Sequence, residues 1–215
     1  MQTANSENFE KFQTLAEEKR ERILNAAMKE FCSGYKNAST DNIVKEAGIS
    51  KGLLFHYFGT KERLYNFLID YAIQTTKREY IDLINIIQPD ILESVWQLSL
   101  LKQDLSIKYP TIFDFLTTVY MDTAAKSEAT TANLARFGAI QAEILSKVHS
   151  HTDISPFRDD IDPKTAMEII NWTLNGYARS KAEQKPFGSA IRENYDQFLA
   201  EFEQILNTLR KCLYK

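Results

Sequence analysis

The stretch ASTDNIVKEAGISKGLLFHYFGTKERL, residues 38–64, decides the fold of this chain. Ser39 is suited to cap a helix, because its hydroxyl can accept a free backbone N–H of the first turn. The spacing of apolar residues predicts a two-turn helix over Thr40–Ala47. Gly48 tolerates the left-handed conformation in which helices commonly end. The stretch therefore begins with a short, capped helix.

A second capped helix follows after a sharp turn. Ser50 is its expected cap, the helix covers Lys51–Phe58, and Gly59 ends it. A longer helix, capped by Thr60, then runs to about residue 81. Two short helices joined by a glycine turn and flanked by longer ones predict a helix-turn-helix. The residues of the second helix that we expect to face inward are Leu54, Phe55 and Phe58.

This stretch resembles the DNA-binding domain of the TetR family of bacterial transcription regulators. The family pattern is a Ser/Thr cap, then Ile-Ala-x-x-Ala-Gly-Val-Ser-x-Gly-x-Leu-Tyr-x-(His/Tyr)-Phe-x-x-Lys-Glu-x-Leu. Val44 departs from the usual Ala, and Phe55 lacks the hydroxyl with which the usual Tyr can reach the DNA backbone. The resemblance covers about the first third of the chain. The matching segments are Ile43-Val44, Ala47-Gly48-Ile49-Ser50, Gly52, Leu54 to Phe58, Lys61-Glu62 and Leu64.

The rest of the sequence also has helical periodicity, without the alternation typical of strands. We predict an all-α chain of about nine helices. A three-helix DNA-binding domain would occupy residues 12–80, and a helical ligand-binding and dimerisation domain residues 81–215. The other helices are expected over residues 12–33, 90–107, 111–123, 126–149, 163–184 and 189–213, with a polar, acidic loop at 150–162.

Charge is distributed unevenly along the 215 residues, whose net charge is −3. Residues 1–80 hold 12 Lys and Arg against 11 Asp and Glu, and residues 81–215 hold 14 against 18. The mild basic excess of the first part fits phosphate contact without establishing it. No leader peptide or membrane-spanning run is expected. Cys32 and Cys212 are interpreted as reduced packing residues of a cytoplasmic protein.

Recognition of DNA needs phosphate contacts that set the register and base contacts that discriminate sequence. Resemblance to the family assigns phosphate contacts to Tyr57 and Lys61, and Ser39 can present its helix N-terminus. Tyr57 can equally be a packed aromatic, and Ser39 a plain helix cap. Base reading falls to the outward face of the second helix. The candidate DNA-contacting residues are Ser39, Thr40, Ser50, Lys51, Gly52, Leu53, Phe55, His56, Tyr57 and Lys61.

The last two helices are predicted to form a dimer interface. Apolar residues recur in the last helix with alternating steps of four and three, which gives an apolar stripe. An internal core of a monomer is the alternative, and resemblance to the family favours a homodimer. The expected interface residues are Ile170, Leu174, Tyr177, Ile191, Tyr195, Phe198, Phe202, Ile205 and Leu209.

Large aromatic residues in the middle of the chain suit a mostly apolar cavity for an unidentified small-molecule inducer. Trp96, Tyr120 and Trp172 are the candidate lining residues, and ordinary core packing is the alternative for each. The histidines and aspartates of residues 149–162 match no standard metal-site spacing, so a solvated loop is favoured and neither metal nor cofactor is expected.

The function favoured by the sequence is a ligand-responsive repressor of the TetR family that binds double-stranded operator DNA as a homodimer. A helical enzyme or ligand carrier is a rival, although no motif for catalysis or phosphate binding is present. A second rival is an interaction protein that kept the fold without operator binding. Salt-dependent binding to DNA separates the first hypothesis from both rivals.

Overall fold

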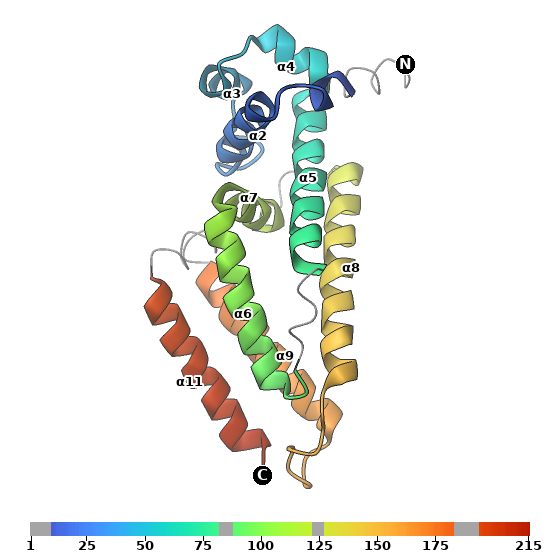
Figure 1. The fold of residues 1–215 in the computed structure, drawn as a ribbon, viewed down its shortest axis with the longest axis vertical. Helices are drawn as coiled ribbons and strands as arrows, with labels where there is room; N and C mark the ends of the chain where they lie inside the picture. Colours follow the sequence, from blue (N-terminus) through green and yellow to red (C-terminus); the bar gives the residue numbers. More distant parts are fainter. Residues whose placement is uncertain (1–9, 82–87, 122–126, 183–193) are drawn as a thin grey trace. The chain divides into compact units, whose positions relative to one another are not determined.

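The computed structural model describes residues 10–81, 88–121, 127–182 and 194–215 (Figure 1). Within these ranges the secondary structure is helical, apart from one isolated bridge between Phe157 and Tyr214. The prediction of an all-α fold is confirmed. None of the described helices is long and apolar enough to span a membrane. The helices are α2 Glu17–Phe31, α3 Thr40–Ala47, α4 Lys51–Phe58, α5 Lys61–Ile81, α6 Ile91–Lys108, α7 Pro110–Met121, α8 Glu128–His151, α9 Pro163–Ala182 and α11 Tyr195–Leu213.

The chain divides into two compact units. The first comprises residues 1–76 and 111–137, and the second comprises residues 77–110 and 138–215. Residues 111–137 thus pack with the N-terminal segment, although they lie beyond the boundary expected at residue 80. The division into domains at residues 12–80 and 81–215 stays a prediction.

The start of the first long helix differs from the prediction. A continuous helix was expected from Phe12, but Ala16 is extended (φ −52°, ψ 136°) and α2 begins at Glu17. The break lets the segment before it fold over the helix-turn-helix. The ring of Phe12 is 1% exposed and lies 4.9 Å from that of Phe58 and 5.6 Å from that of Tyr57. Burial of this ring stabilises the break.

The first unit has an aromatic core that holds α2, α5 and α7 together. Phe31 of α2, Tyr65 of α5 and Phe115 of α7 are all fully buried. The rings of Phe31 and Tyr65 have centroids 4.9 Å apart, and Tyr65 meets Phe115 edge-on at 5.7 Å. Aromatic rings supply much buried area per residue, so this core gives the short helices α3 and α4 a firm platform.

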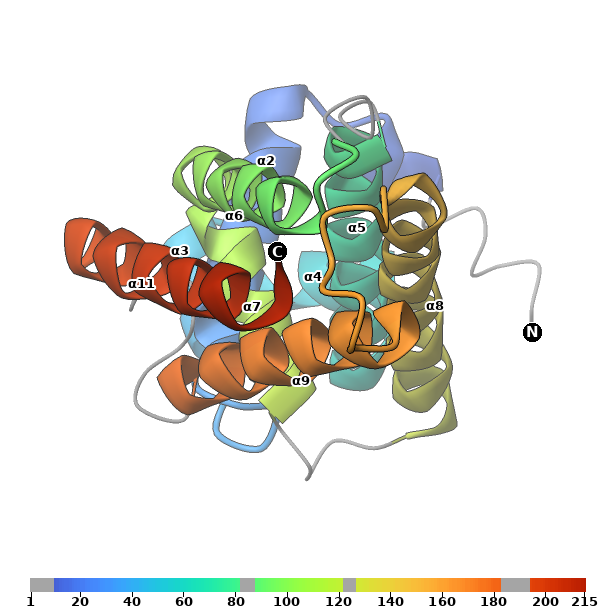
Figure 2. The same ribbon diagram turned by 90° about the horizontal axis from the view of Figure 1, so that it is seen from below.

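The second unit is built on α6, α9 and α11, which Figure 2 shows around one another. Asp90 connects the start of α6 with the end of α11. Its carboxylate caps α6 by accepting from the backbone N–H of Leu92, and it also accepts from the hydroxyl of Tyr214 at 2.7 Å and from Arg210 at 3.2 Å. The fully or largely buried core residues are Ile91, Leu92, Val148, Phe157, Ala166, Ile170, Phe202, Leu206, Leu209 and Leu213.

Candidate nucleic-acid interface

Helix α3 is held at both ends by side chains of α2. The carboxylate of Glu30 accepts from the backbone N–H of Ser39 at 2.8 Å and from the side chain of Asn42 at 3.1 Å. At the other end, Nε of Arg22 donates to the carbonyl of Ala47 at 2.9 Å. An anion at the N-terminus and a cation at the C-terminus of α3 both interact favourably with the helix dipole. Sequence reasoning missed these clamps, because they join residues of separate helices.

We expect Arg22→Ala and Glu30→Ala each to lower the free energy of unfolding by about 1–2 kcal/mol, since each leaves helix-end groups unpaired. Thermal or denaturant unfolding measures this. Lys29→Ala is the matched control from the same helix, because it removes only an exposed ion pair with Glu46. Equal, small effects of all three substitutions would show that α2 does not clamp α3.

The predicted caps are confirmed. Ser39 accepts from the backbone N–H of Asp41 at 3.2 Å, and Ser50 accepts from that of Leu53 at 3.2 Å. The hydroxyl of Thr60 accepts from the backbone N–H of Arg63 at 3.1 Å at the start of α5. Gly48 ends α3 at φ 63°, the left-handed conformation that its sequence position required. Both short helices have the predicted bounds.

The faces of α4 differ in part from the prediction. Leu54, Tyr57 and Phe58 are buried, whereas Phe55 is only half-buried. Positions 54, 57 and 58 share one face of a helix, and position 55 lies about 100° further round. The expectation that Phe55 faces inward is therefore corrected. Tyr57, at 8% exposure, is the packed aromatic of the two alternatives left open above, and its phosphate contact stays an untested prediction.

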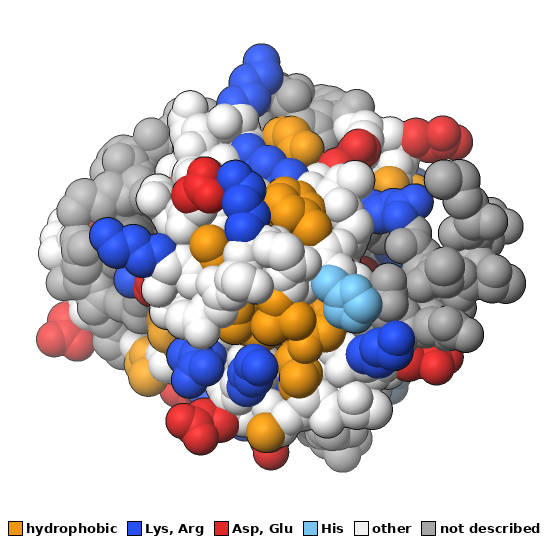
Figure 3. All heavy atoms as spheres, turned by 90° about the horizontal axis from the view of Figure 1, so that it is seen from above, with side chains coloured by type: hydrophobic (Ala, Val, Ile, Leu, Met, Phe, Trp, Pro, Cys, Tyr) orange, Lys and Arg blue, Asp and Glu red, His pale blue; other side chains and the backbone are white. Residues whose placement is uncertain are grey.

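The other candidates on α4 face outward or lie at its edge. Lys51, Gly52 and His56 are exposed, as is the cap Ser50, and Leu53 is half-buried. No atom lies within 4 Å of where a Cβ on Gly52 would stand. Seen over α3 and α4, the surface carries basic side chains around a centre of neutral and hydrophobic groups, with acidic side chains among them (Figure 3).

Both candidate lysines have partners in the free protein. Lys51 pairs with Asp41 at 2.8 Å, which links the first turns of α3 and α4. Nζ of Lys61 donates to the carbonyl of Ala38 and lies 4.8 Å from the centroid of the Tyr35 ring. Lys61 is thus half-buried beside the half-buried Ser39 and Thr40 at the start of α3. Its ammonium group supports the turn before α3, a role that the sequence did not reveal.

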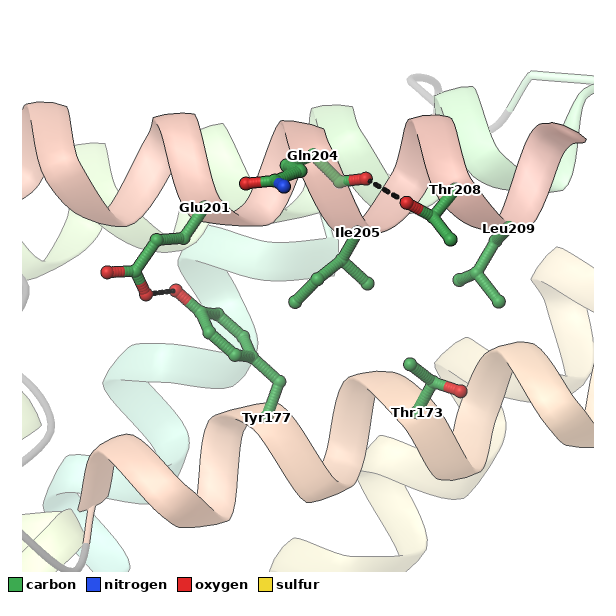
Figure 4. Close-up of a pocket in the computed structure, with 7 residues that line it drawn as sticks. All are labelled: Thr173, Tyr177, Glu201, Gln204, Ile205, Thr208 and Leu209. Carbon is green, nitrogen blue, oxygen red and sulfur yellow. Dashed lines mark hydrogen bonds between the residues drawn. The ribbon is translucent and has the colours of Figure 1, made fainter.

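A groove of about 410 Å³ runs between α9 and α11 in the second unit (Figure 4). At one end, the hydroxyl of Tyr177 donates to Glu201 at 3.1 Å, and Lys181 pairs with the same carboxylate. Burial, together with this carboxylate, raises the pKa of Tyr177 above its usual range. The surface of the groove is nevertheless mostly apolar. The groove is lined by Thr173, Tyr177, Glu201, Gln204, Ile205, Thr208 and Leu209.

The residues predicted for a dimer interface fall into two groups. Ile170, Phe202 and Leu209 are buried in the core of their own unit, so they correspond to the alternative of an internal core. Leu174, Tyr177, Phe198 and Ile205 are half-buried. Tyr195 begins α11, and Ile191 lies outside the described residues, as does the expected helix start at residue 189. Tyr177 and Ile205, with Leu209 at its edge, line the groove.

The three residues proposed to line a ligand cavity are not alike in burial. Trp96 is partly buried and stacks on Phe202 at a centroid distance of 6.1 Å, which is a core position of the second unit. Trp172 is 67% exposed on α9, and Tyr120 is 71% exposed on α7 of the first unit. The expectation that Trp172 and Tyr120 lie inside an enclosed cavity is not supported by these exposures.

The carboxylates of the acidic loop, residues 150–162, have structural roles. Asp162 caps α9 by accepting from the backbone N–H of Thr165, which holds the pKa of Asp162 below its usual range. Asp160 pairs with Arg158 at 2.7 Å, and Asp159 with Lys215 at 2.8 Å. No cluster of three or more metal-ligating side chains occurs in the part of the chain that the structure describes.

One of the two cysteines is not the packing residue that the sequence analysis expected. Neither cysteine is in a disulfide, and Cys32 is half-buried, but Cys212 is exposed near the end of α11. Leu209 and Leu213 are buried on this helix, whereas Cys212 lies about 100° round the helix from Leu213. Cys212 is therefore not a packing residue of its own unit.

Residues 23–67, which include α3 and α4, match the model of the family described as bacterial regulatory proteins, tetR family. None of the curated proteins matches the chain. Among solved structures, a TetR family transcriptional regulator from Chloroflexus aurantiacus is similar, with a TM-score of 0.65 and 20% identity over 96% of this chain and 98% of that one.

Two further solved structures extend the likeness in fold. A TetR family regulator from Agrobacterium tumefaciens has a TM-score of 0.64 and 16% identity over 92% of this chain and 98% of that one. The transcriptional regulator FadR from Bacillus subtilis, in complex with stearoyl-CoA, has a TM-score of 0.57 and 14% identity over 88% of this chain and 96% of that one.

Proposed function

We infer that this chain, which carries the DNA-binding domain of the TetR family, is a transcription regulator that recognises operator DNA by its sequence. The observation that carries this inference is the helix-turn-helix within residues 23–67, with both short helices capped. Helix α4 turns Lys51, Gly52 and His56 outward. These residues can read base edges when such a helix enters the major groove.

A homodimer is the assembly that we propose. Two helix-turn-helix units related by a two-fold axis can read two half-sites about one turn of DNA apart. The open, mostly apolar groove between α9 and α11 supports an interface there, because a second copy would cover Ile205 and the edge of Leu209. Residues buried in each subunit's own core, such as Phe202, would support this surface from behind.

A small molecule bound in the helical domain is proposed to control DNA binding. A ligand can shift the protein only by its difference in affinity for the DNA-binding and the released states. The complex of FadR with stearoyl-CoA is a precedent in a protein of similar fold. The protein would act as a repressor in the cytoplasm, where it reaches DNA.

Lys61 offers a first test of DNA contact. We expect Lys61→Ala to weaken binding to all DNA sequences alike, and to reduce the slope of log K against log salt by about one unit if this ammonium contacts a phosphate. Because Lys61 also supports the carbonyl of Ala38, the variant should melt at a lower temperature. Titrations with duplex DNA at several salt concentrations, below the melting range, measure the slope.

Lys29→Ala is the control for this titration, since Lys29 is an exposed lysine of α2 that pairs with Glu46. It should leave the slope unchanged. An unchanged slope for Lys61→Ala as well would assign Lys61 a purely structural role. A chain that binds no duplex DNA at low salt would instead favour an interaction protein that kept the fold.

A further inference from the structure

We propose that Lys102 of α6 forms an anion-binding site, which takes the carboxylate of an apolar organic acid. Lys102 lies in the third quarter of α6, a helix whose other face carries the exposed residues Asp104, Ile107 and Lys108. The proposal names the ligand class of the regulator inferred above, and in that sense it rests on the proposed function. The site itself is defined by α6 alone.

Lys102 continues the apolar stripe with which α6 packs on the core. The stripe has steps of four and three: Ile91, Val95, Leu98, Lys102 and Leu105. Ile91 and Leu105 are buried, and Val95 and Leu98 pack against the core of the second unit. At 100° per residue, Lys102 lies about 160° from Asp104, so its side chain leaves the helix on the inward face.

Lys102 is accessible to solvent although it lies on the inward face of α6. Its side chain is exposed, although Leu105 and Ser106 on the same face are buried. Burial nevertheless lowers the pKa of its ammonium group, and no neighbouring charge contributes to the shift. The two observations agree if the side chain enters a hollow walled by protein. An inward group that met packed atoms would have no exposed surface.

No hydrogen bond or ion pair engages Lys102 among the described residues. Its neighbour Gln103, 7% exposed, also has a side-chain oxygen without a hydrogen-bond partner in this part of the chain. A cation on the inward face of a helix without a counter-ion is costly, and such groups gather at binding sites. A bound carboxylate would supply the missing charge and accept from the ammonium.

The surroundings select an apolar body for the ligand. Leu98 lies one turn before Lys102 on the stripe, and Leu105 lies one turn after it. A ligand whose carboxylate meets Lys102 therefore runs along aliphatic side chains, where an apolar chain gains most from leaving water. A neutral analogue of equal length would keep the apolar contacts and lose the charge-assisted hydrogen bond.

The test is calorimetric titration of the full chain with dodecanoate, below its micellar concentration, and with dodecanol, below its solubility limit. We expect dodecanoate to bind about 10- to 100-fold more tightly, as one charge-assisted hydrogen bond allows. In Lys102→Met the two ligands should bind alike. Met suits an apolar stripe, so this variant should melt at or above the temperature of the unaltered protein. Lys102→Gln repeats the test with a side chain that is polar but uncharged.

Lys211→Met is the matched control, because Lys211 is an exposed lysine of α11. It should retain the preference for dodecanoate. The proposal is overturned if the unaltered protein binds the two ligands equally or binds neither, or if Lys102→Met keeps the preference. The titration contains no DNA, so its failure is distinct from a failure to bind operator. Whether dodecanoate then releases DNA is measured separately.

Discussion

Replacing Phe202 by glutamate should unfold the second unit. Phe202 is 6% exposed, and its ring stacks on Trp96 and lies 5.7 Å from Phe198. The substitution removes these ring contacts and places a carboxylate among apolar groups, at a combined cost of at least about 3–5 kcal/mol. Since a domain of this size is stable by about 5–15 kcal/mol, most of its helical signal should be lost on mild heating.

Circular dichroism with thermal unfolding, followed by sedimentation, measures this result. Asn207→Glu is the control, because it adds the same charge to an exposed position of α11. It should leave the melting temperature almost unchanged. If Phe202→Glu were to give a well-folded monomer, Phe202 would belong to the interface between subunits and not to the core of its own.

Replacing Gly52 by glutamate should abolish DNA binding while leaving the fold intact. A side chain at Gly52 would enter open space. A glutamate in the first turn of α4 would also interact favourably with the helix dipole. Removing a helical glycine also stabilises the helix by up to about 1 kcal/mol. In the proposed complex, however, the added carboxylate would stand between α4 and the DNA. We expect an affinity loss of at least about 100-fold from charge repulsion and lost approach.

Gly138→Glu is a closely matched control, because Gly138 is another exposed helical glycine with no atom within 4 Å of a built Cβ. It should raise stability similarly and leave DNA affinity unchanged. Fluorescence anisotropy with labelled duplex DNA compares the two variants. Equal DNA affinity for Gly52→Glu and the unaltered protein would mean that the N-terminal turn of α4 does not face DNA.

The helix-turn-helix was predictable because its signals are local. A cap acts within three residues and a glycine at a helix end acts on its own backbone, so Ser39, Ser50 and Gly48 fix the bounds of α3 and α4. The clamps by Arg22 and Glu30 were not predictable, since a single sequence does not show which helices are neighbours. The sequence left the burial of Tyr57 as one of two alternatives for the same reason, because its partner Phe12 lies 45 residues earlier.

The second unit was predictable only in outline. The apolar stripe of α11 is visible in the sequence, but it does not tell a core within one subunit from an interface between two. Phe202 packs inside and Ile205 lines the open groove, while Leu209 is buried at the edge of that groove. Aromatic size likewise did not indicate burial, since Trp96 packs on the core and Trp172 is exposed. The lysine within the apolar stripe of α6 is visible in the sequence, and it could have indicated the proposed anion site.

Sequence-specific binding of duplex DNA is the central claim, and selection from a random pool of about 30 base pairs tests it most directly. The purified chain should enrich a two-fold symmetric sequence. Titrations should then show about 10³-fold or greater preference for that sequence over a scrambled duplex, with affinity falling steeply as salt rises. A chain that enriches no sequence, and binds selected and scrambled duplexes equally at every salt concentration, would contradict the account.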